Sequence, residues 1–122
     1  MLTSITFQLD LLGQRGTHSN AKLELDAIGV RLIVELLERS TVVPIADATS
    51  MNICLRAPSQ ADKTLAATFL TDGTDGRIYY DLATGDLDEI GGWKISAQVI
   101  GPTYNRKSPS FGIFNVVAPI CP

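Results

Sequence analysis

The chain has 122 residues, of which 45% are hydrophobic and 19% are charged, and its formal net charge is −3. This length and composition suit one globular domain that can bury a core without disulfides or a metal. No basic block is present, which argues against nucleic acid or an anionic membrane surface as a partner.

The first 25 residues combine an apolar run with a polar one. Residues 5–12, ITFQLDLL, can form a strand, and residues 13–20, GQRGTHSN, are typical of a loop. The N-terminus lacks the positive start and continuous apolar run of a signal peptide, and no segment has the length of a transmembrane helix. We therefore expect a chain that is made in a cytoplasm and stays soluble.

Residues 26–39, DAIGVRLIVELLER, fit two kinds of element. Apolar residues recur at helical spacing, but they also alternate from Val30 to Leu36 as in a strand. Gly29 and the β-branched side chains that follow it favour the strand.

Five later segments show the alternation of half-buried strands, and turn signals separate them. They are residues 50–58, 63–70, 76–82, 92–100 and 110–117. This spacing is typical of β-sandwiches and small barrels, so we predict an all-β fold. The side chains expected in the core include Phe69, Ile78, Tyr80, Trp93 and Ile95.

The stretch DGTDG raises the question of a cation site. Asp72 and Asp75 are candidate ligands, but the spacing of an EF-hand is absent. Asp-Gly pairs are also preferred in turns that need positive φ. We therefore interpret Asp72, Gly73, Asp75 and Gly76 as a structural turn and keep the metal site as the weaker alternative.

Other chemical groups do not assemble into a catalytic set. Asp86, Asp88 and Glu89 have no partner suited to acid–base catalysis, so a solvated turn in which Asp86 or Asp88 caps backbone amides is the simpler interpretation. His18 is the only histidine and is expected in a solvated loop. We predict neither enzymatic activity nor a cofactor.

The two cysteines, Cys54 and Cys121, do not form a disulfide framework. We expect free thiols. A bridge between them, made by a folded-back C-terminal tail, or a bridge to a neighbouring chain is the alternative.

Residues 101–109, GPTYNRKSP, place a tyrosine beside two cations on an expected loop. Tyr104, Arg106 and Lys107 could stack on a sugar or dock on a partner protein. Loops on a rigid sandwich commonly carry such contacts.

The order of four stretches carries a resemblance: PIADAT at 44–49, RAPSQ at 56–60, ATFLTDGTDGRIYY at 67–80 and GDLDEIGGW at 85–93. Together they resemble the small immunoglobulin-like domain of tailed-phage structural proteins, best known as the N-terminal domain of the baseplate upper protein family. The resemblance covers about residues 26–118 and is most specific over 66–97. RAPSQADK departs from the family's KPDG hairpin, and family members are often fused to longer chains.

The resemblance implies an immunoglobulin-like antiparallel β-sandwich over residues 26–118, with an N-terminal arm or added strand at 1–25 and a C-terminal tail at 119–122. It also implies a non-enzymatic virion protein, synthesised in the host bacterial cytoplasm, that docks on other virion proteins and self-associates in the particle. A small sandwich with spare terminal segments favours a capsid decoration (cement) protein on the major capsid protein. A baseplate, tail or neck component is the alternative.

Two further expectations concern binding surfaces. Ile5, Phe7 and Leu9 in the arm are expected to contact neighbouring subunits, so deletion of residues 1–20 should abolish incorporation into particles and leave the domain folded. The competing function is a sugar-binding module built on Tyr79, Trp93, Tyr104 and Arg106, which expected burial of Trp93 argues against.

Overall fold

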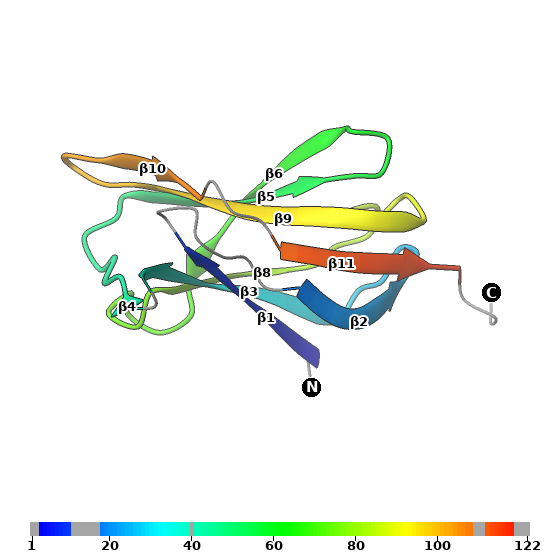
Figure 1. Cartoon of the computed structure of the whole chain (residues 1–122), viewed down its shortest axis with the longest axis horizontal. Coiled ribbons are helices and arrows are strands. Elements are labelled where there is room, and N and C mark those ends of the chain that lie inside the picture. Colours follow the sequence, from blue (N-terminus) through cyan, green and yellow to red (C-terminus); the bar gives the residue numbers. More distant parts are fainter. Residues whose placement is uncertain (1–2, 11–17, 40, 109–111, 119–122) are drawn as a thin grey trace.

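The computed structural model describes residues 3–10, 18–39, 41–108 and 112–118, and this part of the chain is all-β. No helix among these residues is long or apolar enough to cross a membrane. Figure 1 shows two sheets packed face to face as a sandwich. The strands are β1 (Thr3–Asp10), β2 (His18–Glu24), β3 (Val30–Glu38), β4 (Thr41–Val42), β5 (Ser50–Arg56), β6 (Asp62–Ala66), β7 (Thr68–Phe69), β8 (Arg77–Asp81), β9 (Gly91–Ile100), β10 (Asn105–Lys107) and β11 (Gly112–Val117).

The first sheet, sheet A, has the order β1-β3-β8-β7, and β4 pairs with the end of β3. The second sheet, sheet B, has the order β2-β11-β9-β5-β6, and β10 pairs with β9. In Figure 1 the long strand β9 runs along sheet B beside β11, and the β9–β10 and β5–β6 hairpins lie at opposite ends.

The described strand pairs within residues 26–118 are antiparallel, as the sequence led us to expect, and two parallel pairs are made by the strands of residues 3–24. β1 runs parallel to β3, and β2 runs parallel to β11. Neither pair is consecutive in the chain, so no tight turn imposes an antiparallel arrangement on them. The other pairs are antiparallel.

The described part of the N-terminal segment forms β1 and β2, one strand in each sheet. The alternating pattern of β1 places Phe7 and Leu9 on one face, and both side chains are fully buried. Residues 18–20, expected in a loop, begin β2. A chain without residues 1–20 would lose these core contacts, which argues against the expectation that it stays folded.

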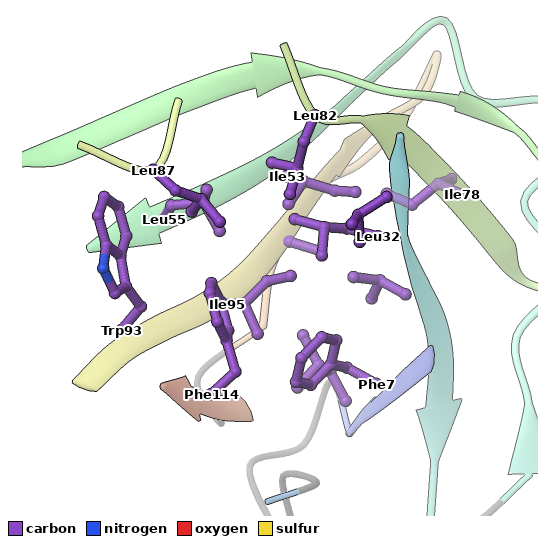
Figure 2. Packing of buried hydrophobic residues seen from close by; sticks show 14 of the residues in the cluster. Phe7, Leu32, Ile53, Leu55, Ile78, Leu82, Leu87, Trp93, Ile95 and Phe114 are labelled. Atoms are coloured by element: carbon purple, nitrogen blue, oxygen red, sulfur yellow. The ribbon is translucent and has the colours of Figure 1, made fainter. Parts of the chain in front are cut away.

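The core lies between the inner faces of the two sheets. The alternating residues of β3 from Val30 to Leu36 are buried, as the strand interpretation of this segment requires. Figure 2 shows Phe114 between Trp93 and Phe7. Its ring centroid is 6.3 Å from that of Trp93 and 5.9 Å from that of Phe7.

The side chains expected in the core differ in how deeply they are buried. Trp93, Ile95 and Ile78 are fully buried. Phe69 and Tyr80 are half-buried and pack against the edge of the cluster.

Residues 63–70, predicted as one strand, are divided between the two sheets. β6 belongs to sheet B and β7 to sheet A, and Ala67 lies between them. The amide of Ala67 still donates to the carbonyl of Met51, 2.9 Å away, before the chain crosses. This crossing joins one edge of sheet B to one edge of sheet A.

Candidate functional site

The DGTDG turn uses its carboxylates for local hydrogen bonds. Asp72 Oδ1 accepts from the amide of Thr74 at 3.0 Å and from its hydroxyl at 2.6 Å. Asp75 accepts from the amide of Arg77 at 3.1 Å and from the hydroxyl of Thr71 at 3.0 Å. The bond from the Thr74 hydroxyl is the main cause that lowers the pKa of Asp72. These contacts are those of Asx turns, in which the side chain organises the backbone that follows it.

The two glycines fix this turn against the end of β3 and the segment that follows β4. The carbonyl of Gly73 accepts from Ile45, and the carbonyl of Gly76 accepts from Leu36, both at 2.8 Å. Gly73 has a φ of +88°, and a Cβ there would lie 2.8 Å from the Cα of Ala46. The turn therefore joins the β7–β8 hairpin to distant backbone as well as reversing the chain.

The acidic side chains of the loop between β8 and β9 also accept hydrogen bonds that stabilise the loop. Asp86 accepts from the Tyr80 hydroxyl and the Ala83 amide, both at 2.8 Å. Glu89 accepts from the amide and the hydroxyl of Ser59 on the β5–β6 hairpin. Within residues 3–10, 18–39, 41–108 and 112–118, no three His, Cys, Asp or Glu side chains gather as a metal-binding group.

Lys63 connects this loop to the core. Its ammonium donates to the carbonyls of Gly85 and Asp86 and lies 3.1 Å from Asp88 Oδ1. It also lies 5.6 Å from the centroid of the buried Trp93 ring, within cation–π range. Lys63 therefore covers the end of the sandwich at Trp93.

The tyrosine and arginine of residues 101–109 make contacts inside the molecule. The Tyr104 hydroxyl donates to Asp47 Oδ1 at 2.8 Å, and Arg106 pairs with the carboxylate of Glu38. Both side chains are half-buried, whereas Lys107 is exposed. Of the three residues predicted to contact a partner, Tyr104 and Arg106 therefore make contacts within the molecule, and Lys107 is a cation on the surface.

The other predicted contact residues lie mainly inside the sandwich. Phe7 and Leu9 are fully buried, and the half-buried Ile5 packs against the core. Trp93 is 0% exposed, and the Tyr79 ring lies 4.0 Å beneath the guanidinium of Arg31. The four residues proposed for sugar stacking therefore do not form one exposed aromatic surface.

Two predicted residues fall on parts that the structure leaves out. The backbone of His18 begins β2, but its side chain lies outside the described residues. Cys121 lies outside them as well. Cys54 is a half-buried free thiol on the outward-facing side of β5.

The outer face of sheet B contains a hollow of about 310 Å³ that the sequence did not indicate. We call it the sheet B hollow. Its side chains come from opposite positions on three strands: Cys54 pairs with Thr64 and Ser96, and Arg56 pairs with Asp62 and Lys94. Ser108 also lines it. The sequence does show polar residues at alternate, outward-facing positions of β5, β6 and β9. Which of them lie opposite one another is known only from the strand register.

The chemistry of the sheet B hollow suits binding better than nucleophilic attack. Burial is the main cause that raises the pKa of the Cys54 thiol, so the protonated form dominates at neutral pH. Around it stand hydroxyls, three cations and one carboxylate, which are groups that form hydrogen bonds and ion pairs with a polar ligand.

Comparisons with known proteins support this architecture. No protein-family model matches the chain, and no curated protein matches it. Among solved structures, the chain is similar to the N-terminal domain of phage TP901-1 ORF48, with a TM-score of 0.71. The fold is that of a phage protein domain. The alignment covers 94% of this chain and 98% of that domain at 12% sequence identity, so the likeness is one of fold. It agrees with the resemblance that residues 66–97 bear to tailed-phage structural domains.

Proposed function

We propose that this chain is a structural component of a tailed-phage particle that binds other particle proteins and catalyses no reaction. The observation that carries the proposal is the similarity in fold, over 94% of the chain, to a domain of a phage protein. The sequence resemblance to phage baseplate domains supports it independently. The acidic residues that could have suggested catalysis, such as Asp86 and Glu89, serve the loop between β8 and β9.

Within the particle, we favour the baseplate or tail over capsid decoration. The case for a decoration protein depended on a small sandwich with spare terminal segments. The described part of residues 1–25 belongs to the two sheets, with Phe7 and Leu9 in the core, which removes much of that case. The resemblance to the baseplate upper protein family then carries more weight.

A carbohydrate-binding role has less support. Sugar-binding sites commonly use an exposed aromatic ring, but Trp93 is buried and Tyr104 is held by Asp47. We propose surfaces for protein partners instead, including other copies of the chain in a multi-copy structure.

Fractionation of the phage particle tests this proposal. Purified particles would be separated into capsids and tails, and the chain quantified in each fraction by mass spectrometry. We expect it in the tail fraction at a fixed ratio to known tail proteins. Absence from purified particles would contradict a virion role, and recovery with capsids alone would contradict the baseplate or tail location.

A further inference from the structure

Strand β1 forms one edge of sheet A. It pairs with β3 on one side, and within the described ranges no strand pairs with its other side. Figure 1 shows it at the margin of the sandwich. A strand at such an edge directs part of its backbone N–H and C=O groups away from its neighbour, where a further strand can bond to them.

The other edge strands of the described part have features that discourage such pairing. β4 and β7 have two residues each, and β10 has three. β2 carries Lys22 and Glu24, and β6 carries Asp62 and Lys63. Short strands and charged side chains are the usual protection of a sheet edge against another chain.

β1 lacks these features over most of its length. Residues 3–9, TSITFQL, contain no charged residue, proline or glycine. All eight residues of β1 pair with β3 in an unbroken register, and the buried side chains of Phe7 and Leu9 hold the strand in the core. The outward side chains of Ser4 and Thr6 are exposed. A long, flat and uncharged edge of this kind is suited to accept a further strand.

The sequence of β1 is complementary to itself when two copies run antiparallel about Thr6, the midpoint of the uncharged stretch. In this register Thr6 faces Thr6 and Ser4 faces Gln8, so polar residues meet on the outer face. Ile5 faces Phe7, so apolar residues meet on the inward face. Threonine pairs and pairs of an aromatic with a β-branched residue are among the cross-strand contacts that stabilise sheets.

We propose that β1 pairs antiparallel with β1 of a second copy of the chain and extends sheet A across a two-fold axis near Thr6. A second copy supplies matching residues on both faces of the strand. The two Asp10 carboxylates lie at opposite ends of the contact, so no like charges face each other. This inference rests on the proposed function, because it names one partner and the surface that meets it.

A single cysteine at the axis tests the pairing. Thr6→Cys would be made in a chain that also carries Cys54→Ser and Cys121→Ser, so that it provides the only thiol. Directly opposite residues have Cβ atoms about 4.5–5.5 Å apart, close to the separation of about 3.5–4.5 Å in a disulfide. We expect oxidised glutathione to convert this variant to a covalent dimer.

Thr68 provides the matched control position. It is an exposed threonine on β7, at the opposite edge of sheet A, and it lies in the same row across the sheet as Thr6, Ile33 and Tyr79. Thr68→Cys in the same cysteine-free background should remain largely monomeric under the same oxidation.

Two charge variants test the association without a covalent bond. Sedimentation equilibrium over a concentration series should show the mass of the native chain rising from 13.1 kDa toward twice that value. Thr6→Lys places two ammonium groups opposite each other and should raise the dissociation constant roughly tenfold or more. Thr68→Lys adds the same charge at the opposite edge and should leave that constant nearly unchanged. Circular dichroism checks that both variants fold.

Several results would overturn the proposal. They are a monomer at every concentration up to the solubility limit with no cross-link through Thr6→Cys, or equal effects of the two lysine variants. A cross-link from Thr6→Cys to a different protein in assembled particles would show that another strand, and not a second copy, occupies the edge. Because the other measurements use the purified chain, their failure leaves the virion role intact, and absence from particles would leave a measured dimer intact.

Discussion

The rings of Phe7 and Phe114 lie 5.9 Å apart, measured between centroids, and their planes are inclined by 52°. This contact joins β1 in sheet A to β11 in sheet B, so the first and last strands meet in the core. The N-terminal strand is therefore needed to complete the sandwich, and its inward side chains are unavailable to a partner protein.

Replacement of Phe7 tests this relationship. Phe7→Ala should lower the free energy of unfolding by about 3–5 kcal/mol, because it leaves a cavity in a packed core. Thr6→Ala, at an exposed position on the same strand, should change it by less than about 0.5 kcal/mol. Urea unfolding of both variants makes the comparison, and an equal effect of the two would show that β1 is not packed as described.

Gly73 and Gly85 form a matched pair of positions for the DGTDG turn. Both have positive φ, +88° and +85°, but a Cβ at Gly73 meets Ala46 whereas a Cβ at Gly85 meets nothing within 4 Å. Gly85→Ala should cost about 1–2 kcal/mol from backbone strain alone. Gly73→Ala should cost more, because the contact with residue 46 must also shift. Thermal unfolding measures both, and a smaller loss for Gly73→Ala would contradict the packing of this turn.

Stability should fall in acid because three exposed carboxyl groups have lowered pKa values. Hydrogen bonds from Arg56, Arg31 and Thr74 are the main causes for Asp62, Asp81 and Asp72 respectively. A carboxyl whose pKa is lower in the folded state stabilises the fold above its unfolded pKa of about 3.9. That stabilisation is lost as the pH falls through the lower, folded value.

Urea unfolding at a series of pH values checks this sign. The free energy of unfolding should decrease from roughly pH 5 downward, and Asp62→Asn should make the decrease shallower. A free energy of unfolding that rises as the solution is acidified over this range would contradict the assigned ion pairs.

The Cys54 thiol should react slowly at neutral pH. Burial raises its pKa, and the nearby charge of Asp62 acts in the same direction, so less thiolate is present than in a free cysteine. In the Cys121→Ser variant, alkylation at pH 8 should be slower than that of a cysteine peptide and should rise through a pKa above the ordinary value. A rate that reaches its plateau below the peptide's own pKa would contradict this environment.

Trp93 distinguishes a core position from a sugar-binding one. Its side chain is 0% exposed, and its indole N–H donates to the carbonyl of Glu89 at 3.0 Å. We expect blue-shifted fluorescence that is protected from an aqueous quencher and unchanged by glycans. Emission typical of water-exposed tryptophan that shifts when glycans are added would restore the sugar-binding hypothesis.

Much of the sheet architecture could be predicted from the sequence, because long runs in which apolar residues alternate are typical of strands with one face in the core. The pattern from Val30 to Leu36 and that of residues 92–100 specify strands whose inward residues are buried. β2 was missed because its sequence, HSNAKLE, is mostly polar and carries little apolar alternation. The division at Ala67 and the parallel edge pairs depend on which strands become neighbours, and local sequence does not encode that.

The candidate site was harder to predict than the fold. The sheet B hollow gathers single residues from β5, β6 and β9, and each of them looks like an ordinary outward-facing strand residue in the sequence. The stretches that stood out, such as DGTDG and the acidic loop after β8, proved to hold backbone and strands in place. The stretches with conspicuous sequence patterns therefore stabilise the fold. The residues of the hollow are brought together only by the register of the strands.

Location of the chain in an intact phage particle tests the central claim most directly. Electron cryo-microscopy of the particle, with this sandwich fitted to the density, gives the position and the neighbouring proteins. We predict density for the sandwich in the baseplate or tail, in contact with other particle proteins. Particles that assemble completely with no such density, or density for the sandwich only on the capsid surface, would contradict this account.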